Sequence, residues 1–256
     1  MATERAPEPF TYGSYLRIPE LTSLQTPLSD GPVPDELLFI IGQQAQELWF
    51  KQILSDLQRA ISLLGATDIF GAITLIERDV RILQALSAES DLLQLIPPIE
   101  FHRFRGILKA ASGLESEQFR ELELASGLRD EGFLRLASKL IDLPAALARW
   151  PISLHAAFVQ VLRPIDEDPV HALVSIYAEP ERFAGVYRLS ETLSEYELRY
   201  QEWRFHHLQV VERVIGDRSP GTGGSAGSAY LMRTLSYRFF PELWEARNRL
   251  AATTRH

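Results

Sequence analysis

The stretch at residues 188–217, RLSETLSEYELRYQEWRFHHLQVVERVIGD, decides the fold of this chain. Its apolar residues recur at steps of three and four, which is the spacing of one face of an α-helix. They are Leu189, Leu193, Tyr196, Tyr200, Trp203, Val210 and Val214. Because such a row normally faces a protein core, the stretch predicts a long helix packed inside a helical domain.

His207 falls in this apolar row. Its neighbour His206 lies about 100° around the helix, on the side of charged and polar residues. The pattern alone leaves two interpretations of the inward histidine. It is either a core histidine hydrogen-bonded to a backbone carbonyl or a metal or haem ligand, since neutral imidazole is the commonest protein ligand for such centres.

Length and composition indicate one large globular domain. The chain has 256 residues, 46% hydrophobic and 23% charged, with a formal net charge of −8. This negative charge argues against broad binding to nucleic acid or anionic membrane. Residues 1–9 are polar and hold two prolines, which predicts a flexible tail, and residues 10–256 predict a single domain. No apolar run reaches the roughly 20 residues that span a bilayer, so we expect a cytoplasmic protein.

The absence of cysteine narrows the chemistry. The chain has no cysteine and six histidines, which excludes disulfides, thiolate nucleophiles and every cysteine-ligated metal, cluster or haem. No His-Glu-x-x-His pair or other close histidine pair at helical spacing is present, so a site built from several histidines has little support. A single axial histidine is the metal arrangement that remains easy to build.

Helical periodicity recurs along the rest of the chain. The expected helices cover residues 34–64, 69–88, 99–111, 115–126, 131–140, 154–161, 168–177, 178–186, 188–217 and 228–248. No segment alternates convincingly with a period of two, so a sheet is not expected. The sequence therefore predicts an all-α, single-domain helical bundle.

Two polar residues fall on faces that should be interior. Arg105 shares a helical row with Phe101, Phe104 and Leu108. Because a buried arginine keeps its charge, its partner is either an acidic side chain of the protein or a ligand carboxylate. Gln43 lies one turn after Phe39 and is either a satisfied core glutamine or the lining of a pocket.

The segment at residues 219–228, SPGTGGSAGS, holds four glycines between positions 221 and 227. It is either a flexible connector or a loop whose backbone N–H groups close around an anion or carboxylate. It is not a phosphate-binding P-loop, because the Gly-Lys-Ser/Thr ending is missing and no strand precedes it.

Several segments, taken in order, resemble the tryptophan 2,3-dioxygenase family of the haem-dependent aromatic oxygenases. They are YGSYL (12–16), DELLFII (35–41), ELWFK (47–51), FHRFR (101–105), ASG (111–113), QFR (118–120), WRFHH (203–207), ERVIG (212–216) and GTGGSAG (221–227). Each segment is modest, but the ordered set is highly specific and covers most of the chain. The resemblance implies an all-α homotetramer that uses haem b and O₂ to open the indole ring of L-tryptophan, giving N-formylkynurenine.

Carried over by position, the resemblance gives roles to individual residues. His207 looks like the axial ligand of the haem iron, and Ser112 and Gly113 look like pocket residues close to the haem. Arg105 looks like the partner of the substrate carboxylate. Thr222, in the glycine-rich loop, looks like the residue that meets the substrate's amino and carboxylate groups.

The same comparison gives the walls of the substrate pocket. Phe39 and Phe101 look like aromatic walls around the indole. Tyr12, Tyr15 and Leu16 would, by family analogy, reach into the pocket of a neighbouring subunit. A flat apolar indole with a zwitterionic tail suits an inward histidine, an inward arginine and a glycine-rich loop together.

The chain departs from the family pattern around this pocket. The family has a histidine where this chain has Gln43, and a Thr-Ser pair or similar where it has Ala45 and Gln46. The amide oxygen of Gln43 can accept a hydrogen bond from the indole N–H, but the amide cannot act as an acid or base. Three alternatives stay open: a monooxygenase that converts a substituted tryptophan to an oxindole or hydroxylated product, a non-catalytic haem protein, and a haem-free helical scaffold.

Overall fold

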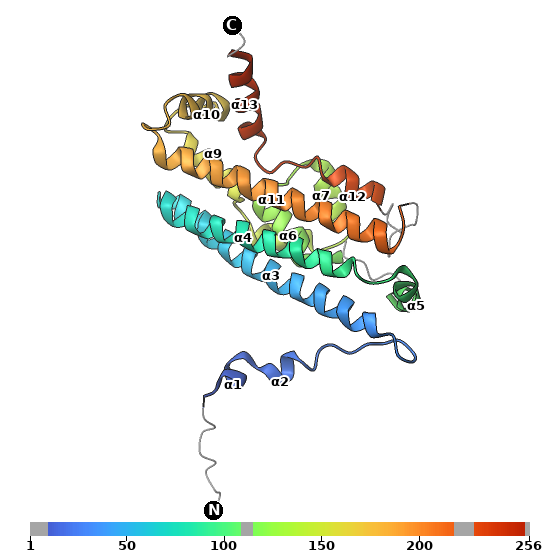
Figure 1. Cartoon of the computed structure of the whole chain (residues 1–256). Coiled ribbons are helices and arrows are strands. Elements are labelled where there is room, and N and C mark those ends of the chain that lie inside the picture. Colours follow the sequence, from blue (N-terminus) through green and yellow to red (C-terminus); the bar gives the residue numbers. More distant parts are fainter. Residues whose placement is uncertain (1–9, 109–114, 218–227, 254–256) are drawn as a thin grey trace, which may run out of the picture.

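The structure is a computed structural model that describes residues 10–108, 115–217 and 228–253. Every regular element within these ranges is a helix, which confirms the predicted all-α fold (Figure 1). The helices are α1 (Tyr12–Leu16), α2 (Ile18–Leu21), α3 (Pro34–Gly65), α4 (Ile69–Leu93), α5 (Pro98–Leu108), α6 (Glu117–Ser126), α7 (Glu131–Ala137), α8 (Leu143–Arg149), α9 (Leu154–Leu162), α10 (Pro169–Ala178), α11 (Ala184–Val214), α12 (Ser228–Thr234) and α13 (Pro241–Thr253).

Three long helices, α3, α4 and α11, lie side by side at the centre of the bundle (Figure 1). Helix α3 runs antiparallel to α4. The Asp56 side chain of α3 pairs with Arg78 of α4, and Gly42, earlier on α3, packs against Leu93 at the end of α4. Helix α4 runs parallel to α11, because Glu77 pairs with Arg188 at 2.8 Å and Asp91 pairs with His206 at 3.0 Å. Therefore α3 and α11 are antiparallel.

Local sequence signals explain where the central helices begin. Pro34 and Glu36 belong to the first turn of α3, where the missing proline N–H costs nothing and a carboxylate faces the positive end of the helix dipole. The Asp68 side chain caps α4 by accepting the N–H of Gly71 at 2.9 Å. Thr67, at a φ of 63°, turns the chain between the two helices.

The prediction of one helix over residues 228–248 is wrong. The structure has α12 and α13 there, separated by residues 235–240. A proline inside a helix removes a backbone hydrogen bond and clashes with the preceding turn, whereas Pro241 begins α13, where its ring does no harm. The break is stabilised from far away in sequence, because the buried carboxylate of Glu197 on α11 accepts the N–H groups of Phe239 and Phe240.

The buried apolar side chains form two clusters. The larger one fills the bundle between α3, α4, α6, α9, α10, α11 and α13. The smaller one lies where the start of α3, the ends of α4 and α11, and α5 meet. Its buried members are Leu93, Ile96, Phe101, Phe104 and Val214, with Val33, Leu38, Phe39, Leu108, Val210 and Ile215 packed against them. This second cluster contains the predicted aromatic walls.

Residues 10–33, here called the N-terminal arm, extend away from the helical body (Figure 1). Near its end, the N–H of Leu28 donates to the carboxylate of Glu36 at 2.7 Å, and Gln25 bonds Gln44 of α3. The predicted flexible tail at residues 1–9 lies outside the described residues. Within the described ranges, no single helix has the length and apolarity to cross a membrane; only α8 and α9, as a bent pair, pass that test by length and composition alone.

Candidate functional site

His207 lies on α11, one turn after Trp203, and its ring stacks on the Trp203 indole with centroids 5.8 Å apart and planes 23° apart. The Nδ1 atom is enclosed and has no hydrogen-bond partner among the described residues. The Nε2 atom is not enclosed. The structure therefore does not show the alternative of a core histidine bonded to a backbone carbonyl.

Burial lowers the pKa of His207 to about 4, and the positive charge of Arg204 acts in the same direction. The imidazole is therefore neutral near pH 7, and neutral imidazole is the form that binds a metal ion. His206 behaves differently: it points outward as predicted, and its Nδ1 lies 3.0 Å from the Asp91 carboxylate. The helix geometry thus directs His207 into the bundle and His206 towards its surface.

Two further aromatic rings pack against Trp203, the residue on which His207 stacks. The Phe50 ring of α3 meets Trp203 edge-on at 5.4 Å, and the Phe119 ring of α6 lies 5.2 Å from it. Gln118, beside Phe119, donates to the carbonyl and the carboxylate of Glu47, at 2.9 and 2.7 Å. These contacts fix α3 and α6 against the histidine-bearing part of α11.

A buried ionic network lies one turn before His207, and the sequence did not predict it. Glu123 of α6 is fully buried and pairs with both Arg120, at 2.9 Å, and Arg204 of α11. Arg204 also donates to the carbonyl of Thr234, at 3.3 Å, which connects α11 to α12. Burying charges requires such pairing, but the linear sequence presents these residues as ordinary helix-surface charges.

The predicted aromatic walls come together in the smaller cluster. The Phe39 and Phe101 rings are 5.8 Å apart, and both contact Phe104, at 5.5 and 5.0 Å. Val210, one turn beyond His207 towards the end of α11, packs against the same cluster. The apolar surface expected for an indole ring is therefore next to the helix that carries the candidate iron ligand.

Arg105 and Gln43 both lie near these aromatic residues. Arg105 follows Phe104 on α5 and is partly buried, in agreement with its place in an inward row. Gln43 is also partly buried, one turn after Phe39 on α3. A Cβ on its neighbour Gly42 would lie 2.8 Å from a methyl carbon of Leu93, so α3 and α4 pack closely at the level of Gln43.

Three predicted site residues, Ser112, Gly113 and Thr222, lie outside the described residues. The positions that flank the glycine-rich loop are described, however. The Ser228 hydroxyl donates to the carbonyl of Asp217 at 2.7 Å, which holds the two ends of the loop together just after α11. The two ends of the loop that contains Thr222 therefore lie beyond His207, at the same end of the bundle as the aromatic cluster.

The arm residues Tyr12, Tyr15 and Leu16 are not part of this arrangement within one chain. Tyr12 is 77% exposed and Tyr15 67% exposed, and Leu16 is exposed as well. Their helix α1 packs mainly against α2. A single chain therefore does not bring these residues to Phe39 and Phe101.

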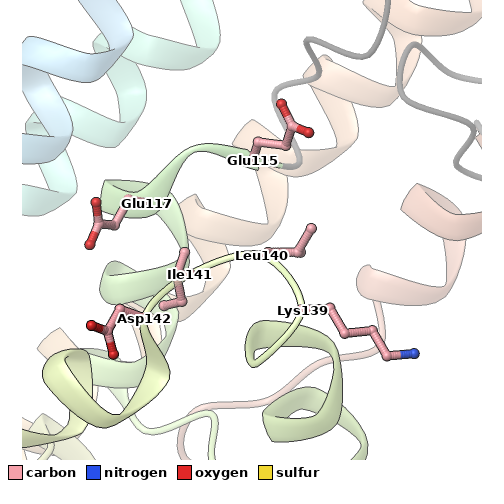
Figure 2. A pocket seen from close by; sticks show the side chains of 6 residues that line it. All are labelled: Glu115, Glu117, Lys139, Leu140, Ile141 and Asp142. Carbon is pink, nitrogen blue, oxygen red and sulfur yellow. The ribbon is translucent and has the colours of Figure 1, made fainter.

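A separate surface cavity of about 430 Å³ contains none of the predicted site residues. Figure 2 shows that its side chains spread apart rather than converge: the Glu117 and Asp142 carboxylates extend to one side and Lys139 to the other. Leu140, Ile141 and Glu115 complete the lining. Its lining has no histidine and no aromatic ring, so it does not fit an indole or a haem.

The described residues contain no group of three or more His, Asp or Glu side chains arranged to hold a metal ion. Haem iron needs fewer protein ligands, because the porphyrin supplies four nitrogens and one axial histidine is sufficient in several haem proteins. His207 fits that need, with a neutral ring, an enclosed Nδ1 and an Nε2 that is left open.

Comparison with known proteins identifies relatives along nearly the whole chain. The family model described as tryptophan 2,3-dioxygenase matches residues 2–150 and 169–250. A protein of that name from Herpetosiphon aurantiacus is 40% identical over 254 residues, covering 93% of this chain and 97% of the relative. Those from Caulobacter vibrioides and Nocardioides sp. are 37% and 39% identical, and the alignments cover 94% of this chain and 98% and 94% of the relatives.

Proposed function

This chain belongs to the tryptophan 2,3-dioxygenase family, and we propose that it is a haem-dependent enzyme that inserts both atoms of O₂ at C2–C3 of the indole ring of L-tryptophan. The product is N-formylkynurenine. The observation that carries the proposal is His207, a neutral and partly enclosed imidazole on a helix that also packs against the Phe39–Phe101 cluster. The ordered sequence matches to the family support the same activity.

His207 would hold haem b through its Nε2 atom, and Ser112 and Gly113 would line the haem pocket. The bound haem supplies the binding and activation of O₂. The residues of the protein position the other reactant and exclude water, which is worth several orders of magnitude in rate when two reactants are held in a reactive geometry.

The substrate is held at both of its ends. The planar guanidinium of Arg105 pairs with the substrate carboxylate through two parallel hydrogen bonds, a geometry that lysine does not reproduce. Thr222 bonds the amino and carboxylate groups from the loop after α11. Phe39 and Phe101 cover the indole with apolar surface from the same cluster that packs on α11.

Gln43 orients the indole without taking part in proton transfer. Its amide oxygen accepts the indole N–H, and a primary amide neither gains nor loses a proton near neutral pH. Replacing an imidazole by an amide at this position therefore keeps a hydrogen-bond acceptor and removes a base. In the proposed reaction, the role of Gln43 is to select and hold the ring.

The assembly proposed for this function is a homotetramer in which the N-terminal arm of one copy covers the pocket of another. Exposed apolar side chains gather on the arm, including Phe10 at 83% exposure, Tyr12 and Tyr15, and such patches mark interaction surfaces.

Light scattering on the purified protein should give the mass of four chains. Tyr15→Ala should raise KM for tryptophan, whereas Phe70→Ala, at an exposed aromatic in the first turn of α4, should not; a monomer with full activity would contradict the assembly.

Isotope labelling tests the reaction itself. The ferrous haem-loaded protein is given L-tryptophan and ¹⁸O₂, and the product is analysed by mass spectrometry. Two labelled oxygens in N-formylkynurenine are expected. One labelled oxygen, or turnover only with a ring-substituted tryptophan, would replace the proposal with a monooxygenase, and a substrate-induced spectral change without any turnover would indicate a non-catalytic haem protein.

A further inference from the structure

Several enclosed polar side-chain atoms have no hydrogen-bond partner among the described residues, and three of them belong to facing turns of α3 and α11. They are Nε2 of Gln46, Nε1 of Trp203 and Nδ1 of His207. Gln46 and Trp203 are both only 4% exposed. Because buried polar groups are normally bonded, three such atoms near one another call for a common explanation.

The helix register places these atoms at one level of the bundle. The Phe50 and Trp203 rings are in contact, at 5.4 Å. One turn from Phe50 towards the start of α3 is Gln46, and one turn from Trp203 towards the end of α11 is His207. Because α3 and α11 are antiparallel, both steps move in the same direction along the bundle, so Gln46 lies opposite His207.

The chemistry of the three groups is complementary. The indole Nε1–H is always a donor, and a neutral imidazole carries one N–H, at either Nδ1 or Nε2. Rotation of the Gln46 amide about its last side-chain bond exchanges its nitrogen and oxygen. The oxygen has two lone pairs, so in that orientation it can accept both the Trp203 Nε1–H and a proton on Nδ1 of His207.

We propose that Gln46 is a positioning residue for His207. Its amide oxygen accepts the Nδ1–H, which fixes the tautomer whose Nε2 lone pair is free to bind iron. Ligating histidines generally use their second nitrogen in this way, and the partner fixes both ring orientation and ligand strength. The inference rests on the proposed function, since it assumes that His207 binds haem.

If Gln46 only filled space in the core, its replacement would alter stability but not the properties of bound haem. The two roles therefore differ in what they predict for the iron.

The first experiment compares Gln46→Met and Gln46→Glu with the haem-loaded parent. Gln46→Met removes the acceptor at similar volume, so the Fe–His stretching frequency should fall and the haem should dissociate about 10–100-fold more readily. Gln46→Glu supplies a stronger acceptor and should raise that frequency. It should also lower the reduction potential of the haem, by on the order of 59 mV for a tenfold change in the one-electron equilibrium. Gln58→Met, at an exposed glutamine of α3, is the matched control. Parent values in both Gln46 variants would overturn the proposal.

The second experiment does not depend on haem or on the folding of one variant. Histidine labelled with ¹⁵N reports the tautomer of His207 in the haem-free protein, assigned by comparison with His207→Ala. The Nδ1–H form is expected in the parent and should be depleted in Gln46→Met; the Nε2–H form in the parent would overturn the pairing. If the parent binds no haem but shows the expected tautomers, the proposed function fails and the pairing alone survives.

Discussion

Asp79 is predicted to weaken the fold at neutral pH, and Asp79→Asn to strengthen it. Asp79 lies on α4 with no exposed surface and both carboxyl oxygens enclosed. Burial raises its pKa well above the ordinary value, and the negative charge of Asp56 raises it further, while the positive charge of Arg78 acts in the opposite direction. Desolvation also opposes ionisation of Asp56, but hydrogen bonds from Arg78 and Gln52 outweigh it and lower the pKa of Asp56. The ionised partner is therefore Asp56, and Asp79 carries the proton.

The sign of the pH effect follows from proton binding. The folded protein holds a proton on Asp79 that the unfolded chain has released above its own pKa of about 3.9. Stability from this group is therefore complete below that pH and is lost as pH rises towards the folded pKa, by about 1.4 kcal/mol per pH unit. Asparagine has nearly the same shape and does not ionise, so the gain at pH 7 has an upper bound of about 4 kcal/mol.

Urea unfolding at several pH values and one protein concentration measures this difference. The stability of Asp79→Asn relative to the parent should grow from about pH 5 to pH 7, and that of Asp30→Asn, at an exposed aspartate, should stay constant. A gain for Asp79→Asn that does not change with pH, or a loss of stability at pH 7, would refute the assignment of a buried proton to Asp79.

Three further predictions address the site and the helix packing. His207→Ala should abolish the haem absorption band that His206→Ala retains, because only His207 presents an unenclosed nitrogen from the interior face of α11; equal haem content in both would contradict the ligand assignment. Arg105→Lys should lower kcat/KM for tryptophan about 10–100-fold, since charged hydrogen bonds contribute about 1.5–3 kcal/mol each, and unchanged kinetics would remove Arg105 from the substrate. Glu197→Ala should lower the free energy of unfolding by about 3–5 kcal/mol, because the buried carboxylate accepts backbone N–H groups of the segment before α13. Glu245→Ala, at an exposed glutamate, should lower it by less than about 1 kcal/mol.

Helical periodicity was sufficient to predict the central helices, but it missed a helix break that is stabilised by a residue far away in the sequence. The expected helix at residues 34–64 is α3 with one more residue, and the row containing His207 lies on α11. The break between α12 and α13 was missed because its cause, the carboxylate of Glu197, belongs to another helix. Proline at position 241 was the local signal that could have indicated it.

The candidate site shows the same division between local and distant causes. The inward direction of His207 follows from the spacing of its helix, whereas the meeting of Phe39 with Phe101 was implied by the family resemblance. The pairing of Glu123 with Arg204 does not, because a charged residue on a helix gives no sign of which neighbour will bury it. Tyr12 and Tyr15 cannot be placed from one chain at all if their binding surface belongs to another copy.

Helix α3 connects the two sides of the proposed haem site. Gln43 and Gln46 are three residues apart on it, and the first is assigned to the substrate and the second to His207. The close contact of Gly42 with Leu93 and the bonds from Gln118 to Glu47 fix the axial position of this helix between α4 and α6. A shift of α3 along its axis would therefore move both amides together, so substrate orientation and iron ligation depend on the same packing. We therefore expect the effects of substitutions at positions 43 and 46 on kcat/KM to be non-additive in a double-mutant cycle. The effect of Gln58→Met should be additive with that of either substitution. Strict additivity between positions 43 and 46 would show that the two roles are independent.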